Sequence, residues 1–421
     1  MSTLFKNGYI LLPSLKAVRG DVSVENGIIS YVGEKAPDID YGETFDLHGN
    51  LLMPGFCNAH THSAMTFIRN GADDLPLDRW LKERIFPVEA KLTPDDVYIF
   101  TKLAILEYLS GGTTSCFDMY FYNEAFVSAV TDCGFRAVLC GAVNDFSQSA
   151  EMIEDGFIKY NKISPFISYK LGFHAEYTCS EPLLRDIAAL SEKYHAPVYC
   201  HLSETKQETE GCIARHGMTP TAYLESLGMY NNGGGGFHCV YMTDNDIEIF
   251  RRHGLYAVTN PCSNAKLGSG IAPLVKLLNA GIPIAVGTDG AASNNSLDMF
   301  REVYLGTVLQ KAVLCDPVAM PAGEMLKAAL SGSAAAMGIN CGRIEKGCAA
   351  DLVVIDLDQP NMQPTANIPE SLVYSASVRN VMLTMIGGKV LYKDGEYFIG
   401  EAPEEIFKKA SAAKKKLFEK I

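Results

Sequence analysis

The chain has 421 residues and a formal net charge of −13, and 48% of its residues are hydrophobic against 20% that are charged. This length and composition fit a globular protein with a large core and more than one structural unit. The acidic balance argues against binding to a nucleic-acid backbone, which needs clustered Lys and Arg, and is compatible with a small-molecule substrate.

The cysteines and the apolar segments indicate a cytoplasmic protein. Twelve cysteines are scattered through the sequence without CxxC spacing, which is typical of reduced, buried thiols. The N-terminus lacks a signal-peptide pattern, and no window approaches the roughly 18 uninterrupted apolar residues of a membrane span. We therefore expect a protein that binds neither a membrane nor nucleic acid.

Both ends of the chain have β character. Residues 1–54 predict short strands, with Asn26-Gly27 as a hairpin signal between two alternating segments. Residues 345–400 resume this pattern, with Gly387-Gly388 as a turn, and predict strands over 351–356, 372–376 and 380–392. We expect the two ends to pair in one small β-sandwich beside the central domain.

Residues 401–421 predict a terminal helix. One face at helical spacing is apolar and consists of Ile406, Ala410, Ala413, Leu417 and Ile421. Glutamates at its start and lysines at its end match the helix dipole.

The middle of the chain, residues 55–344, alternates short apolar strands with helical stretches. Helices are predicted over 94–110, 181–194 and 271–279. The eight predicted strands are 56–60, 113–118, 136–141, 167–174, 197–201, 236–239, 256–259 and 283–287. Such alternation indicates parallel βα units, and eight of them predict an α/β fold with a closed (β/α)8 TIM barrel.

Polar residues end several of these predicted strands, at the face where such barrels carry their active sites. Five of the nine histidines lie there, together with one aspartate: His60, His62, His174, His201, His238 and Asp289. His60 and His62 are two residues apart, so an extended chain directs both to the same side.

This set of residues predicts metal-dependent hydrolysis. Three neutral imidazoles and one carboxylate suit zinc or ferrous iron, and such a metal lowers the pKa of its water and generates hydroxide. Glu204, three residues after His201, can move the proton to a ring nitrogen. Taken singly, His238 is also compatible with a core histidine, Asp289 with a turn and Glu204 with a helix start. Their common place at strand ends favours catalysis.

Five motifs resemble the amidohydrolase superfamily in order and spacing: PGFCNAHTHSAM (54–65), CHLSET (200–205), FHC (237–239), NPCSNAKLGSGIAP (260–273) and GTDGAASNNSLDM (287–299). A sixth similarity, over 342–356, covers the return to the small β domain. Binuclear members use a carboxylated lysine at the end of strand four. Here His174 occupies that end and Lys170 lies deeper, so the resemblance implies one metal ion.

Within that superfamily the chain most resembles the 5-methylthioadenosine/S-adenosylhomocysteine deaminases, through residues 75–93, 134–139 and 174–180. The resemblance implies roles for nine residues: metal binding by His60, His62, His201 and Asp289, which also assists catalysis; proton transfer by Glu204 and water activation by His238; and substrate contacts by Glu89, Arg136 and His174, with Glu204. Trp80, the only tryptophan, is expected to stack on the base of the substrate. From the residues alone, Glu89 could also be an ordinary paired glutamate, Arg136 a structural ion-pair partner and Trp80 a loop filler.

The implied reaction is attack of metal-bound hydroxide on C6 of an adenosine derivative, with release of ammonia. Two departures concern the substrate: Glu176 stands where relatives carry Pro, and residues 144–156 contain no Arg. The second departure weakens S-adenosylhomocysteine and leaves 5′-methylthioadenosine, adenosine or another aminated ring open. The alternatives are a guanine, cytosine or triazine aminohydrolase or chlorohydrolase, and a non-catalytic scaffold. The resemblance also implies a homo-oligomer.

Overall fold

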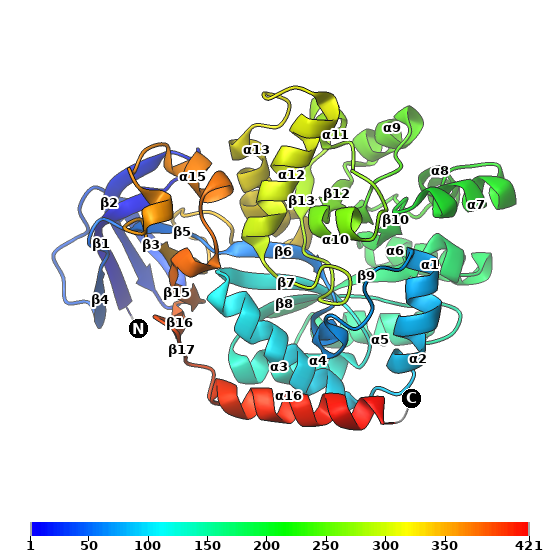
Figure 1. Ribbon diagram of the computed structural model, residues 1–421, viewed down its shortest axis with the longest axis horizontal. Coiled ribbons are helices and arrows are strands. Elements are labelled where there is room, and N and C mark those ends of the chain that lie inside the picture. Colours follow the sequence, from blue (N-terminus) through cyan, green and yellow to red (C-terminus); the bar gives the residue numbers. More distant parts are fainter. Residues whose placement is uncertain (1, 420–421) are drawn as a thin grey trace.

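The computed structural model describes residues 2–419 and consists of a barrel with a small β domain at one side (Figure 1). Eight parallel strands form the barrel sheet in the order β13-β12-β11-β10-β9-β8-β7-β6. They are β6 (Phe56–Thr61), β7 (Thr113–Met119), β8 (Arg136–Cys140), β9 (Ile167–Ala175), β10 (Val198–Leu202), β11 (Gly234–His238), β12 (Tyr256–Thr259) and β13 (Ile284–Val286). Each overlaps a predicted strand, so the predicted (β/α)8 fold is confirmed.

The barrel closes between its first strand, β6, and the residues that follow its last strand, β13. The Asp289 amide donates to the His60 carbonyl at 2.9 Å, and Asn58 is joined to Thr288 by two hydrogen bonds of 2.7 and 2.9 Å. Gly287 permits this approach, because a Cβ there would lie only 2.5 Å from the His60 nitrogen. Closure therefore brings the end of the eighth strand beside the end of the first.

Helices cover the outside of the barrel (Figure 1). They are α1 (Leu77–Arg79), α2 (Phe86–Glu89), α3 (Pro94–Ser110), α4 (Asn123–Cys133), α5 (Ala150–Tyr160), α6 (Glu181–Tyr194), α7 (Lys206–His216), α8 (Pro220–Ser226), α9 (Asp244–His253), α10 (Pro261–Lys266), α11 (Leu274–Asn279), α12 (Met299–Leu314), α13 (Ala322–Lys327) and α14 (Ser333–Met337). Helices α3 and α6 have the predicted bounds. Helix α11 begins three residues later than predicted, because Pro273 disfavours helical geometry in the residue before it.

The two chain ends form one mixed sheet of nine strands. They are β1 (Ser2–Leu11), β2 (Ala17–Glu25), β3 (Ile28–Gly33), β4 (Glu43–Asp46), β5 (Leu51–Pro54), β14 (Leu352–Ile355), β15 (Val381–Ile386), β16 (Lys389–Lys393) and β17 (Glu396–Tyr397). The ends join where β14 pairs antiparallel with β5. Asn26 and Gly27, with φ of 50° and 81°, make the predicted hairpin between β2 and β3.

The two faces of this sheet have different partners. One face encloses its own core, with side chains such as Phe5 of β1, Val24 of β2 and Met385 of β15. On the other face, Met53 and Val353 belong to the main core shared with the barrel. The small domain is therefore packed against the barrel through its central strands, β5 and β14.

Residues 372–376 were predicted as a strand, and this prediction is wrong. Helix α15 spans Ile368–Tyr374 and has a proline in its first turn. Its buried residues Ile368, Leu372 and Val373 recur at helical spacing, so the apolar run covers a core from a helix.

The predicted terminal helix is α16 (Pro403–Phe418), which lies beside α3 (Figure 1). Ile406, Ala410 and Leu417 of its predicted apolar face are buried, whereas Ile421 lies outside the described residues. Across residues 2–419, none of the helices combines the length and apolar character needed to cross a membrane.

Candidate active site

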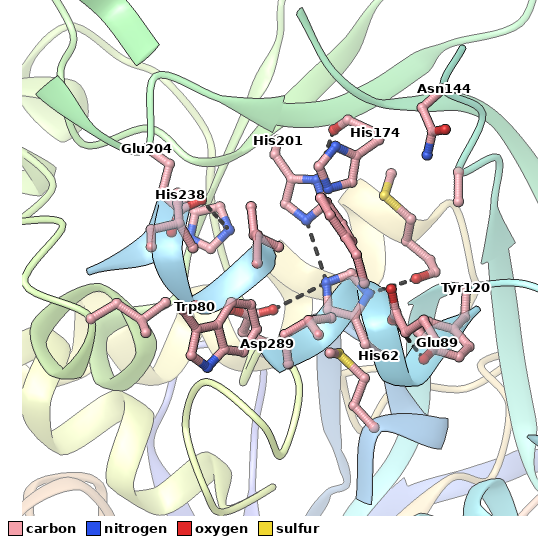
Figure 2. A pocket seen from close by; sticks show the side chains of 18 of the residues that line it. His62, Trp80, Glu89, Tyr120, Asn144, His174, His201, Glu204, His238 and Asp289 are labelled. Carbon is pink, nitrogen blue, oxygen red and sulfur yellow. Dashed lines mark hydrogen bonds and ion pairs between the residues drawn. The ribbon is translucent and has the colours of Figure 1, made fainter. Parts of the chain in front are cut away.

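The predicted histidines converge at the carboxyl ends of the barrel strands. His60 lies in β6, His174 in β9 and His201 in β10, while His238 is the last residue of β11. Figure 2 shows His62, His174, His201 and His238 pointing into one cavity, together with Asp289 from the loop after β13. Since parallel strands end at the same face of a barrel, their terminal side chains can share one site.

Four histidines and the aspartate are close enough to hold a metal ion. Two overlapping groups, His60–His62–His201 and His60–His238–Asp289, each bring their nitrogen or oxygen atoms within 4.8 Å of one another. Asp289 Oδ1 lies 3.5 Å from His60 Nε2 and 3.2 Å from His62 Nε2. His201 Nε2 lies 3.3 Å from His62 Nε2. Imidazole nitrogens and a carboxylate in this number are typical zinc ligands.

His60 is the strongest sign that a cation belongs here. Its side chain is fully buried, and neither ring nitrogen has a hydrogen-bond partner within residues 2–419. Burial lowers the pKa of His60 to about 3, and burial with neighbouring imidazoles holds the pKa of His201 well below its usual range. Both rings are therefore neutral, which is the form that binds a divalent metal, and the residues present fit such an ion.

Neighbouring groups orient these side chains. His62 Nδ1 donates to the Met119 carbonyl at 2.6 Å, and His201 Nδ1 donates to the His174 carbonyl at 2.7 Å. A carbonyl can only accept, so each Nδ1 carries a proton, and each Nε2 is the ring nitrogen that faces the cluster. Asp289 and the Met119 carbonyl raise the pKa of His62 to about 9, so this ring would give up its Nε2 proton on binding a metal ion.

Asp289 is held in the same way by two hydroxyl groups. Its Oδ2 accepts hydrogen bonds from Ser263 and Ser293 at 2.6 and 2.8 Å. Its Oδ1 is consequently left to face His60 and His62.

Glu204 and His238 face each other beside this cluster. Glu204 Oε2 lies 3.8 Å from His238 Nε2, and Ser269 donates to its other oxygen at 3.2 Å. Burial raises the pKa of Glu204 above its ordinary value. His238 Nδ1 is bound to Asn264 Oδ1 at 2.8 Å. A buried carboxyl group with a raised pKa is suited to taking up a proton and releasing it again.

A cavity of about 700 Å³, including its open mouth, lies over the cluster. One wall comes from residues 77–89, where a π-helical turn, Trp80–Ile85, joins α1 to α2. The lining is largely apolar or aromatic, and its carboxylates are Glu89, Glu204 and Asp289. The residues that line the described cavity include no Lys or Arg.

Three of the four further residues predicted to contact the substrate line this cavity. Glu89 accepts a hydrogen bond from the Tyr120 hydroxyl at 2.7 Å (Figure 2), and burial raises its pKa. Burial lowers the pKa of His174 to about 4. Trp80 is buried, and its Nε1 has no partner among the described residues. Each group therefore has a polar atom or a ring available to a ligand.

Arg136 does not line the cavity, so its predicted substrate contact is wrong. It is the first residue of β8 and therefore lies at the opposite end of the barrel. Its Nε and Nη2 bind Asp351 at 2.5 and 3.0 Å, and Nη1 donates to the Pro165 carbonyl at 3.1 Å. The alternative interpretation, a structural ion pair, is the one observed.

Glu176 is also structural. It is 3% exposed and is bound to Arg215 at 2.5 Å and to His216 at 3.2 Å, both on α7. This carboxylate fixes α7 to the end of the fourth barrel strand and does not line the cavity.

Sequence reasoning missed several residues around the site. Four of them orient Asp289, His238 or Glu204 and lie within the motifs at 260–273 and 287–299: Ser263, Asn264, Ser269 and Ser293. Glu208 was missed as well, and its available signal was the spacing Thr205-x-x-Glu208, which is typical of a capping box.

Comparison with known proteins places the chain in a family. The amidohydrolase family model matches residues 51–391. A 5-methylthioadenosine/S-adenosylhomocysteine deaminase of Caldicellulosiruptor saccharolyticus is 38% identical over 413 residues, covering 96% of each chain. A 5′-deoxyadenosine deaminase of Methanothermobacter thermautotrophicus is 39% identical over 385 residues, covering 90% of each. The crystal structure of a zinc-bound adenosine deaminase from Xanthomonas campestris has a TM-score of 0.93 at 33% identity, covering 99% of this chain and 98% of that one. The chain belongs to the amidohydrolase family.

Proposed function

We propose that the protein is a hydrolytic deaminase that replaces the 6-amino group of an adenosine derivative with oxygen and releases ammonia. The observation that carries this proposal is the pairing of buried Glu204 with His238, 3.8 Å apart, beside a cluster of imidazoles and one carboxylate. The deaminase names of the relatives support the same chemistry.

His60, His62, His201 and Asp289 would hold one divalent metal ion, zinc in preference to ferrous iron. When bound, it would lower the pKa of a water molecule and supply the attacking hydroxide. A single ion is supported by the position of Lys170, whose Nζ lies against Gly338, 2.8 Å from where a Cβ there would be. Lys170 does not line the cavity, so it is not placed to bridge two ions.

The acid–base groups then have separate tasks. Glu204 takes a proton from the attacking water and delivers it to N1 of the ring. His238, oriented by Asn264, and Asp289, held by two serine hydroxyls, orient the water toward C6. The hydroxyl group now on C6 then gives up its proton, which reaches the amino group, so that the C6–N bond breaks, ammonia leaves and C6 keeps the oxygen as a carbonyl.

The substrate contacts come from the cavity wall. Glu89, oriented by Tyr120, can accept hydrogen bonds from two vicinal ribose hydroxyls. Trp80 would contact the bound nucleoside through its ring and Nε1, and His174 would meet the purine from the opposite side. These three roles follow from the cavity position of each side chain.

The preferred 5′ substituent is uncharged. A carboxylate-bearing tail would need a cationic partner, whereas the cavity lining holds three carboxylates and no described Lys or Arg. The neighbouring segment 144–156 has no Arg either. We therefore place 5′-methylthioadenosine, 5′-deoxyadenosine and adenosine ahead of S-adenosylhomocysteine.

An ammonia-release assay on metal-analysed protein tests the proposal, with these four nucleosides, guanine, cytosine and a chlorinated triazine side by side. We expect turnover of the adenosine derivatives, with kcat/KM higher for those with uncharged tails. If only guanine or cytosine released ammonia, the protein would be a different aminohydrolase. If only the triazine reacted and released chloride, it would be a chlorohydrolase. The cytoplasmic location and a homo-oligomeric state stay predictions.

A further inference from the structure

The helix α7 begins immediately after the loop that carries Glu204, and its first turn contains a second buried glutamate, Glu208. Thr205 caps the helix: its hydroxyl accepts from the Glu208 amide at 3.1 Å, and Glu208 Oε2 accepts from the Thr205 amide at 3.4 Å. This reciprocal pair is a capping box, which stabilises the start of a helix.

Glu208 does more than cap its helix. Its Oε1 accepts from the Ser203 amide at 2.7 Å, and its Oε2 accepts from the Glu204 amide at 2.7 Å. Three consecutive backbone N–H groups therefore converge on one carboxylate that is 6% exposed. Ser203 has φ of 51°, an uncommon backbone conformation for a residue with a side chain, so the loop needs such support.

Two capping boxes that use aspartate in place of glutamate provide an internal comparison. In Thr93/Asp96 and Thr243/Asp246 the carboxylate binds the amide and hydroxyl of its own threonine. Asp246 also accepts from the Thr219 hydroxyl, but within the described residues neither aspartate accepts from the backbone amides of the two residues before its threonine. An aspartate is therefore sufficient for the cap, and the extra methylene of Glu208 gives the reach to Ser203 and Glu204.

The Ser203 peptide also connects the two acid–base loops. Its carbonyl accepts hydrogen bonds from the amides of Val240 and Tyr241, at 3.1 and 2.8 Å. These residues lie two and three positions after His238, so the peptide group whose amide is bound by Glu208 is bound through its carbonyl to the His238 loop.

We propose that Glu208 is a positioning residue that holds the backbone of Glu204 and thereby sets its distance from His238. The inference rests on the proposed function, since the consequence of the contact is the placement of the proton-transfer group. It assigns Glu208 no contact with the substrate, because Glu208 does not line the cavity.

The surroundings of Glu208 agree with this role. Its carboxylate is close to Glu204, Tyr177, Cys200 and Cys239, none of which supplies a positive charge. Burial and the charge of Glu204 raise the pKa of Glu208 to about 7, whereas the backbone N–H groups lower it. The ionised carboxylate therefore depends on the amides that it positions.

The variant Glu208→Asp separates the two tasks, because it keeps the helix cap and loses the reach to Ser203 and Glu204. The matched control is Glu210→Asp, which makes the same change on the same helix at an exposed position. Both proteins would be compared with the wild type for kcat, KM, metal content, melting temperature and amide exchange over residues 201–205.

We expect Glu208→Asp to lower kcat by about 10- to 100-fold, since a small misplacement of a reacting group has effects of this size. KM, metal content and melting temperature should stay close to wild type, and exchange of the Ser203 and Glu204 amides should become faster. Glu210→Asp should match the wild type in every measurement.

Two results would overturn the inference. The first is a Glu208→Asp enzyme with wild-type kcat and unchanged exchange. The second is a parallel loss of kcat, metal and melting temperature, which would make Glu208 an ordinary structural residue. If the wild type releases no ammonia, the proposed function fails separately, and amide exchange still decides whether Glu208 holds the loop.

Discussion

Two buried charged clusters lie at opposite ends of the barrel strands, and they differ in how completely their polar atoms are satisfied. At the amino end, Arg136 uses all three of its nitrogens, and Asp351 also accepts from the Gly387 amide at 2.8 Å. At the carboxyl end, neither buried ring nitrogen of His60 has a hydrogen-bond partner among the described residues, and Asp289 Oδ1 lies 3.5 Å from Nε2. The polar atoms of the first cluster are satisfied within the chain, whereas those of the second fit a cation.

This difference shows that a buried charge is not by itself evidence of a binding site. Arg136 and Asp351 form a closed pair that joins the barrel to the small β domain, and nothing in their geometry calls for a ligand. Buried polar groups are normally hydrogen-bonded, so the exceptional group, His60, indicates where a metal belongs. The following experiments test this contrast, beginning with the largest expected effect.

Removal of the metal should abolish ammonia release, because the carboxyl-end cluster is completed only by a cation. Treatment with a chelator followed by dialysis should remove about one ion per chain, and added zinc should restore the rate. Metal content and initial rate would be measured on the same samples. Full activity of the metal-free protein would show that the histidine cluster does not need a cation for catalysis.

The substitution Glu204→Gln should lower kcat by roughly 10²- to 10⁴-fold, which is the usual contribution of a general acid–base group. The amide has nearly the same shape but cannot take up the proton. Steady-state rates and metal analysis check this prediction, and the metal content should not change. Loss of the metal together with activity would instead make Glu204 part of the metal site.

The substitution Arg136→Met should destabilise the protein by about 3–5 kcal/mol, since it leaves the buried carboxylate of Asp351 without its partner. The value of kcat/KM for the folded enzyme should stay at the wild-type level. Urea unfolding and kinetics test the two parts. Arg343→Met, which removes a more exposed pair with Glu345, is the control and should cost less than about 1 kcal/mol. If the variant were as stable as the wild type but had a much lower kcat/KM, Arg136 would have a role in substrate binding or catalysis.

Another buried carboxyl group, Glu302, lies outside both clusters and should affect only the pH dependence of stability. Burial raises its pKa from 4.5 to about 8, while Cys262 and Asn294 donate to it. The folded state therefore binds this proton more tightly than the unfolded state. Its contribution to stability is present below pH 4.5 and is lost as the pH rises towards about 8, with a slope of at most about 1.4 kcal/mol per pH unit.

Glu302→Gln cannot ionise and should therefore flatten this slope. The free energy of unfolding would be measured in urea for both proteins, at several pH values across that range. Equal slopes in the wild type and the variant would show that Glu302 is not the titrating group.

The sequence was sufficient for the barrel because strand positions depend on local apolar runs. It was also sufficient for the convergence of the candidate metal ligands, because His60, His201 and Asp289 lie at or just after the ends of such strands. It was insufficient for Arg136, whose function depended on whether residue 136 begins or ends a strand. Local pattern also failed for residues 372–376, where burial by a helix and by a strand give similar short apolar runs.

Glu208 and the serines that hold Asp289 could not have been assigned from sequence alone. Their roles depend on how loops fold and meet in space, as in the contact of Ser263 with Asp289 or of Glu208 with the amide of Ser203, a residue with positive φ. Capping boxes can be recognised from sequence, but the additional hydrogen bonds of one box become visible only when the loop before it is placed.

The most direct test of hydrolytic deamination is mass spectrometry of the product formed from 5′-methylthioadenosine in ¹⁸O-labelled water by zinc-loaded protein. The account predicts that the 6-amino group is replaced by one labelled oxygen, with one equivalent of ammonia released. Unchanged substrate in the presence of a full complement of zinc, or a product without the label, would contradict it.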